Sequence, residues 1–311
     1  MERPPTNLNQ SFSNTGAHDK PNFSNIYLRT QEDDVPTCSN GQVSLYYETF
    51  GNVSQPTLVL VNGLSSQCIS YSEEFCGLFV DQGFHVIRFD NRDVGLSSDG
   101  PKGYSLSDMG NDVLAILDDL DIASSHLYGM SLGGMIVQTL AIDSPHRVRS
   151  LISVMSTTGD RDVGQASAQA AALLMTPGST QRDEAVANHL AGLRVWGSPE
   201  HFDEMAITEF AHRMYERACR PQGVVRQFRA LRRDGSRSER LSQINTPTLV
   251  IHGTSDTLID ISGGRRTAEV IGGAQFHSVE GMGHDCPPHF WDEIVGVVTA
   301  HAQKSDKVGL I

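Results

Sequence analysis

Two patterns of hydrophobic and polar residues run along most of the chain. Short apolar runs predict strands. They cover residues 43–50, 57–61, 85–89, 125–128, 151–155, 248–251 and 275–279. Apolar residues at helical spacing predict helices over residues 72–82, 104–120 and 132–141. Because buried strands alternate with helices, the pattern predicts an α/β fold with a mostly parallel sheet covered on both faces.

The strand pattern stops after residue 155 and does not return until residue 248. Patterns rich in Ala, Leu, Arg and Glu replace it, and they predict helices such as 167–174 and 204–219. Helices inserted between two core strands are typical of a cap over a binding site. We therefore predict a core of residues 36–160 and 240–305 and a helical cap of residues 161–239. Residues 1–35 are rich in Asn, Ser and Pro without periodicity, which predicts a disordered extension.

The segment YGMSLGGM, residues 128–135, places Ser131 between Gly129 and Gly133. It follows a predicted strand and precedes a predicted helix. A serine at such a sharp turn projects its hydroxyl above the sheet, and glycines relieve the crowding on either side of it. The following helix directs its positive end and free N–H groups to the same place. The N–H of Leu132 is therefore a candidate donor to an oxyanion.

An acid and a histidine follow Ser131 in the chain order that this chemistry requires. Asp256 lies in LVIHGTSDTLID after the strand at 248–251, and Asp260 in the same loop is the alternative. Either aspartate could instead only cap the helix that follows. His284 lies in the Gly-rich segment VEGMGHDCPP after the last strand. His284 would accept the Ser131 proton while Asp256 fixes its tautomer, and this chemistry needs no metal or organic cofactor.

The loop VNGLSSQ follows the strand at 57–61 and is expected to supply the second oxyanion donor. Either the N–H of Leu64 or that of Gly63 could face Ser131, and the sequence leaves the choice open. Cys286, two residues after His284, has no base assigned to it. We therefore interpret Cys286 as a packing residue.

Four segments together resemble the α/β-hydrolase family, in the branch of aclacinomycin methylesterase-like enzymes and LipG-type lipase/esterases. They are FDNRDVGLSS, GMSLGG, PTLVIHGTSD and GMGHD. The resemblance implies a carboxylic ester hydrolase with Ser131, Asp256 and His284 as its catalytic triad. Many members carry His-Gly in the oxyanion loop, whereas this chain carries Asn62 before Gly63. In FDNRDVGLSS we expect Asp90 and Arg92 to form a structural ion pair.

Composition excludes several classes of function. Among 311 residues the formal net charge is −13, so nucleic acid is not an expected partner. The basic run at 226–240 is interrupted by Asp234 and Glu239 and predicts a solvated helix and loop. Five scattered cysteines without a C-x-x-C pair argue against a disulfide framework and a zinc site, and they favour the cytoplasm. No apolar segment is long enough to cross a bilayer.

We therefore predict a serine hydrolase that cleaves a small-molecule carboxylic ester through an acyl-enzyme. The same triad also serves thioesterases, C–C hydrolases and cofactor-free perhydrolases or haloperoxidases. A hydrolase-fold ligand-binding protein is the alternative from another class. Serine rather than a carboxylate at the turn argues against dehalogenases and epoxide hydrolases. Apolar residues of the predicted cap suggest a substrate with a hydrophobic part: Leu173, Leu174, Met175, Trp196, Phe202, Met205 and Phe210.

Overall fold

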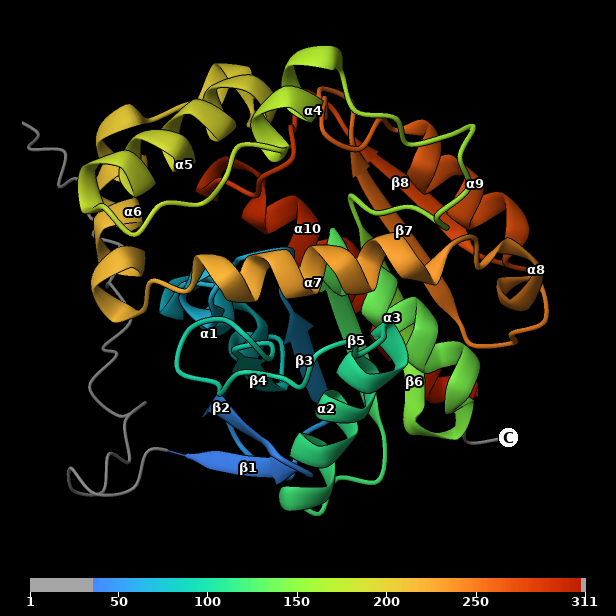
Figure 1. Ribbon diagram of the computed structural model, residues 1–311. Coiled ribbons are helices and arrows are strands. Elements are labelled where there is room, and N and C mark those ends of the chain that lie inside the picture. Colours follow the sequence, from blue (N-terminus) through green and yellow to red (C-terminus); the bar gives the residue numbers. More distant parts are fainter. Residues whose placement is uncertain (1–35, 309–311) are drawn as a thin grey trace, which may run out of the picture.

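A computed structural model describes residues 36–308, and its centre is an eight-stranded sheet in the order β1-β2-β4-β3-β5-β6-β7-β8 (Figure 1). The strands are β1 (Thr37–Asn40), β2 (Val43–Phe50), β3 (Thr57–Val61), β4 (His85–Phe89), β5 (Ser125–Met130), β6 (Val148–Val154), β7 (Thr248–Gly253) and β8 (Gln275–Val279). Strands β3 to β8 pair in parallel, whereas β1 pairs antiparallel with β2 and β2 with β4. The predicted α/β fold with a mostly parallel sheet is confirmed.

Helices cover both faces of the sheet. They are α1 (Glu73–Asp81), α2 (Leu106–Asp119), α3 (Leu132–Asp143), α8 (Ser238–Leu241), α9 (Ser262–Val270) and α10 (Trp291–Val308). On one face, Met109 of α2 and Ile136 of α3 join a single apolar core with Leu241 of α8. On the other face, Phe79 of α1 and Ile294 of α10 join a second core. Every residue of β3 and β4 is buried, which explains the apolar run of β3, while β4 also buries His85 and Arg88.

Helix α2 begins later than the sequence pattern indicates. The hydroxyl of Ser105 accepts a hydrogen bond from the Asp108 N–H, and the Asp108 carboxylate accepts one from the Ser105 N–H. This reciprocal pair caps the helix at Ser105. Tyr104, which carries helical spacing in the sequence, instead lies before the cap and donates its hydroxyl to Asp93.

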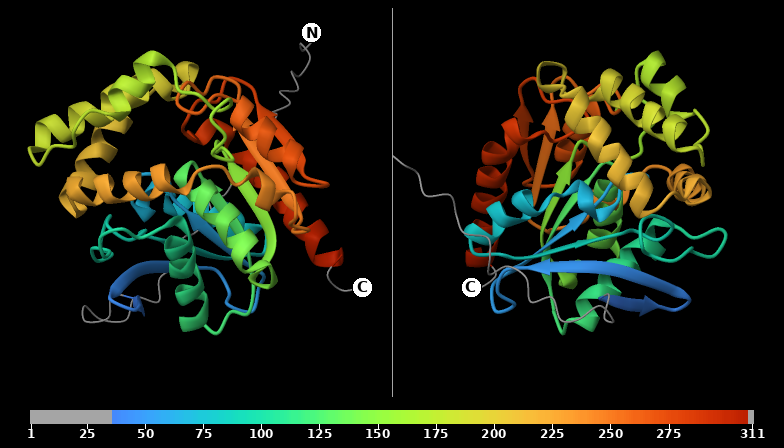
Figure 2. Two further views of the ribbon diagram at one scale, coloured as in Figure 1. Left: turned by 45° about the vertical axis from the view of Figure 1, so that its right-hand side comes forward. Right: turned by 90° about the vertical axis from the view of Figure 1, so that its left-hand side faces the viewer.

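Five α-helices lie between β6 and β7, and we call the first four of them the inserted helices. They are α4 (Ala168–Leu174), α5 (Arg182–Trp196), α6 (Glu204–Arg217) and α7 (Pro221–Asp234). Figure 1 shows α4, α5 and α6 beyond the carboxyl end of the sheet, while α7 crosses in front of it. Both views of Figure 2 place α4–α6 at the same end of the molecule. The division into core and cap stays a prediction, and residues 1–35 lie outside the described residues.

The basic run at 226–240 forms the end of α7, a loop and the start of α8, and four of its six arginines are exposed, as its composition predicts. Some of its residues are nevertheless buried. Gln227 of α7 is fully buried, and only 1% of Arg237 is exposed. The Arg237 guanidinium donates to the Thr157 carbonyl and pairs with Asp234.

Short 3-10 turns complete the fold: η2 (Cys68–Ser70), η3 (Pro145–Arg147), η4 (Pro199–His201) and η5 (Pro288–Phe290).

Candidate active site

Ser131 lies at the turn between β5 and α3 in a strained backbone conformation. Its φ is 56° and its ψ is −118°, a combination that non-glycine residues rarely adopt. The Ser131 N–H donates to the Val154 carbonyl at 2.9 Å, and the Ser156 hydroxyl donates to the Ser131 carbonyl at 2.8 Å. Bonds on both sides of the residue therefore hold this conformation in place.

Glycines beside Ser131 allow neighbouring backbone to approach closely. A Cβ at Gly133 would lie 2.0 Å from the Val61 carbonyl oxygen, and one at Gly129 would lie 2.3 Å from the Gly133 oxygen. These contacts involve backbone atoms, which cannot rotate away as a side chain can. The sequence G-M-S-L-G therefore meets a steric requirement of the turn.

Substituting Gly133 by alanine is expected to destabilise the protein by about 3 kcal/mol, because the added methyl group overpacks the backbone of β3. Urea unfolding followed by circular dichroism measures the effect. Gly296→Ala in α10 is the matched control, since a Cβ there meets no atom within 4 Å. It should leave stability unchanged or raise it by about 1 kcal/mol. Equal unfolding midpoints for the two variants would contradict the steric account.

The structure pairs His284 with Asp256. Nδ1 of His284 lies 2.7 Å from Oδ2 of Asp256, whose side chain is fully buried. Oδ1 of Asp256 accepts the N–H groups of Leu258 and Ile259, both at 2.9 Å. Asp260, the alternative acid in the sequence, instead accepts the N–H of Ser262 at the start of α9. Of the two aspartates, only Asp256 is hydrogen-bonded to His284.

A second histidine, missed by the sequence reasoning, also lies beside Asp256. The buried His252 places Nε2 3.4 Å from Asp256 Oδ2 and 2.8 Å from the Ile259 carbonyl oxygen. Burial alone would raise the pKa of the Asp256 carboxyl, but the charge of His284 and hydrogen bonds from both histidines outweigh it. The pKa of Asp256 therefore lies below its usual range. The available signal was position, because His252 lies near the end of strand β7, a few residues before Asp256 in PTLVIHGTSD.

The end of helix α5 holds the loop that carries His284. The His284 N–H donates to the Trp196 carbonyl at 2.5 Å, and the Gly283 N–H donates to the Ser198 hydroxyl at 2.9 Å. That hydroxyl in turn donates to the Asp285 carboxylate at 2.5 Å. His284 and the residues on either side of it are thus bonded to the last residue of α5 and to Ser198 just after it.

The same end of α5 contacts the loop that carries Asp256. The hydroxyl of Thr257 donates to the Val195 carbonyl at 2.8 Å. The acid and histidine loops are therefore both bonded to one short segment of the inserted helices, residues 195–198.

The loop after β3 abuts Ser131. A Cβ at Gly63 would lie 3.2 Å from the Ser131 Cβ and 3.7 Å from its Oγ. Within residues 36–308, the N–H groups of Gly63, Leu64 and Leu132 have no backbone acceptor. All three are therefore available to an incoming oxygen atom, and the choice between Gly63 and Leu64 stays open. No hydrogen bond joins Ser131 Oγ to His284 in this part of the chain, and such bonds often form only when substrate is present.

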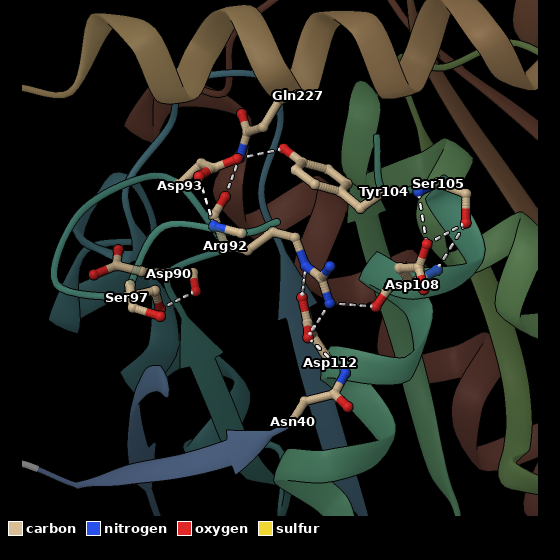
Figure 3. A network of polar contacts seen from close by, with 12 residues as sticks. Asn40, Asp90, Arg92, Asp93, Ser97, Tyr104, Ser105, Asp108, Asp112 and Gln227 are labelled. Carbon is tan, nitrogen blue, oxygen red and sulfur yellow. Dashed lines mark hydrogen bonds and ion pairs between the residues drawn. The ribbon is translucent and has the colours of Figure 1, made fainter. Parts of the chain in front are cut away.

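The expected pair between Asp90 and Arg92 does not form. Arg92 instead binds Asp112 of α2 through two nitrogens at 2.6 and 2.7 Å, as Figure 3 shows. Asp90 pairs with Arg217 of α6 at 2.8 Å and accepts the Cys68 N–H at 2.7 Å. The reason for the difference is that the Asp90 carboxylate caps neighbouring loops, so that Arg92 extends toward α2.

Cys286 packs against the apolar core beside α10. Burial, with a smaller effect of Asp285, raises the pKa of its thiol to about 12. The thiolate that nucleophilic chemistry requires is therefore disfavoured, in agreement with a packing role.

The alpha/beta hydrolase fold model matches residues 56–286. The chain belongs to the α/β-hydrolase fold family. Rhodomycin D methylesterase DnrP of Streptomyces peucetius is 28% identical over 292 residues, which cover 85% of this chain and 97% of the relative. 3-Oxoadipate enol-lactonase 2 of Acinetobacter baylyi is 28% identical over 239 residues, which cover 76% of this chain and 84% of the relative. A hydrolase structure from Pseudomonas aeruginosa superposes with a TM-score of 0.71 at 26% identity, covering 87% of this chain and 99% of that one.

These relatives are hydrolases, and the first two carry an ester or a lactone in their names. This α/β-hydrolase has Asn62 at the position where many members have histidine. The Asn62 side chain donates to the Gln67 carbonyl at 3.1 Å and so closes the oxyanion loop on itself.

Among residues 36–308 of this α/β-hydrolase, no cluster of three or more His, Cys, Asp or Glu side chains is arranged to hold a metal ion. In the same part of the chain, none of the helices combines the length and the apolar character that a membrane span needs.

Proposed function

We propose that this α/β-hydrolase cleaves carboxylic esters with Ser131 as nucleophile, His284 as general base and Asp256 as the acid that orients His284. The proposal is carried by the 2.7 Å pair of His284 and Asp256, at the edge of the sheet where the Ser131 turn lies. Strands β5, β7 and β8 are parallel, so the loops after them meet at one edge.

In the proposed reaction, His284 Nε2 accepts the hydroxyl proton as Ser131 Oγ attacks the ester carbonyl carbon. The resulting oxyanion receives hydrogen bonds from the Leu132 N–H and from the N–H of Leu64 or Gly63. The alcohol then leaves with the proton from His284, and an acyl-enzyme remains. His284 next takes a proton from water as the water oxygen attacks the acyl carbon. The bond to Ser131 Oγ then breaks, His284 returns the proton to that oxygen, and the acid is released.

The inserted helices suit a substrate with a hydrophobic part. None of the seven apolar residues singled out in the sequence is fully buried, so each keeps some side-chain surface accessible to solvent. Met175 is 64% exposed and Met205 is 79% exposed. We propose an acyl or alcohol group larger than methyl on at least one side of the ester, and the two ester- and lactone-named relatives support the bond type.

Labelling by a fluorophosphonate, followed by peptide mass spectrometry, tests the nucleophile, and hydrolysis of p-nitrophenyl esters from acetate to octanoate tests the bond. We expect one label, on Ser131, and faster turnover of the longer esters. Ser150→Ala is the matched control, because the Ser150 hydroxyl lies beside His126 rather than Ser131 and the variant should still be labelled. Absence of labelling in folded protein would favour a ligand-binding protein. Labelling without turnover of any ester would contradict ester hydrolysis and favour thioester or C–C substrates.

A further inference from the structure

The middle of the oxyanion loop is bonded to the inserted helices. The Ser65 N–H donates to Gln227 Oε1 at 3.1 Å, and Gln227 Nε2 donates to the Arg92 carbonyl at 2.9 Å. Gln227 lies on α7 and is fully buried. Figure 3 shows its amide directed from α7 toward the Arg92 backbone. One side chain thus joins the loops that follow β3 and β4.

The oxyanion loop needs such support because its conformation is unusual. Ser65 has a φ of 64°, which is unfavourable for a serine. At the start of the loop, Asn91 Nδ2 donates to the Asn62 carbonyl at 3.0 Å. At its end, Gln67 Nε2 donates to the Met214 carbonyl at 2.8 Å. Between these two anchors, the hydrogen bond from Ser65 to Gln227 fixes the turn that contains Leu64.

Helix α7 is itself held firmly against the core at this point. A Cβ at Gly223, one turn before Gln227, would lie 2.0 Å from the Asp93 carbonyl oxygen. The Arg226 guanidinium pairs with the buried Asp93 carboxylate at 2.6 Å. The close approach and the ion pair leave the Gln227 amide little freedom to move.

We propose that Gln227 is a positioning residue for the oxyanion loop. It holds the Ser65 N–H and thereby aims the adjacent loop N–H groups at the place where negative charge develops above Ser131. The proposal rests on the proposed ester hydrolysis. Loss of Gln227 should therefore weaken stabilisation of the transition state more than it weakens substrate binding.

Gln227→Met keeps the length of the side chain and removes both hydrogen bonds. We expect kcat for a p-nitrophenyl ester to fall about 10- to 100-fold while KM changes less than about 3-fold, because one misaligned donor weakens oxyanion binding. The inhibition constant of an alkyl trifluoromethyl ketone, which forms a tetrahedral oxyanion with serine, should rise by a similar factor. Arg233→Gln is the matched control: it removes a hydrogen bond from the same helix to the Gly103 carbonyl without touching Ser65, Arg92 or Asp93, and its kcat should stay near that of the wild type.

An unchanged kcat in folded Gln227→Met, or equal losses of kcat in both variants, would overturn the positioning role. If Gln227→Met does not fold, Gln227→Asn replaces it. This variant keeps the amide but shortens the side chain by one methylene group, so that it no longer reaches Ser65 and Arg92 together, and ketone inhibition and kcat must still weaken together. If the wild-type protein itself hydrolyses no ester, the proposed function is overturned. A failure of the positioning role looks different, because the wild type is then active and Gln227→Met keeps its kcat.

Discussion

Replacing Ser131 by alanine is expected to lower kcat for ester hydrolysis by about 10⁶-fold, because no other group can form the acyl-enzyme. Progress curves with p-nitrophenyl esters at high enzyme concentration measure the residual rate. Fluorophosphonate labelling of the same preparation should disappear. A variant that retains more than about one hundredth of the wild-type rate would show that Ser131 is not the nucleophile, since loss of this group removes covalent catalysis completely.

The same position offers a control for folding. With φ at 56° and ψ at −118°, Ser131 stores backbone strain that glycine does not feel. Ser131→Gly should therefore be inactive and yet more stable than Ser131→Ala by about 1 kcal/mol. Thermal unfolding of the two variants tests this order. The reverse order would show that the turn is not strained as its dihedral angles indicate.

Asp256→Asn is expected to lower kcat by about 10⁴-fold with little change in KM. Nδ1 of His284 lies 2.7 Å from Asp256 Oδ2, so an amide there could present a donor and select the wrong tautomer of the imidazole. It would also lose the charge that stabilises the imidazolium. Asp260→Asn is the matched control, because its carboxylate bonds only to the start of α9. Steady-state kinetics of both variants decide between the two aspartates, and a larger loss in Asp260→Asn would reverse the assignment.

The lowered pKa of Asp256 also has a consequence for stability. A carboxyl whose pKa is lower in the folded than in the unfolded chain stabilises the fold above its unfolded pKa. This contribution is lost as the pH falls toward the folded pKa. Asp256→Asn should therefore be less stable than wild type at neutral pH, and the difference should shrink in acid. Urea unfolding between pH 7 and pH 3 checks the sign.

Strands were predicted from the sequence better than contacts between distant segments. Strands β3 and β4 match their predicted bounds because every position in both is buried and most positions are therefore apolar. Helix α7 is solvated on one side, as predicted, but the sequence did not indicate its buried face, which consists of the small or polar residues Gly223, Gln227 and Ala230. The partner of Arg92 is Asp112 on helix α2, and no local pattern in FDNRDVGLSS identifies it.

For the candidate site, chain order suggested Asp256 and His284, which the structure brings within 2.7 Å of each other, but the capping and orienting roles considered for Asp256 are not exclusive. Asp256 accepts two backbone N–H groups, as a capping aspartate does, and also accepts His284. Its two carboxylate oxygens divide these tasks. His252 was missed because one histidine within an apolar strand reads as ordinary core.

The bonds between residues 195–198 and the loops of Asp256 and His284 bear on how the enzyme could be engineered. Exchanging the inserted helices with those of a relative is an obvious route to new substrates. Cut sites at the predicted borders, residues 161 and 239, would carry Trp196 and Ser198 away with the exchanged segment. A chimera would then receive foreign partners for its own His284 loop. Successful transplants should therefore retain residues 195–198 of the recipient, so that the exchangeable part is smaller than the whole insertion.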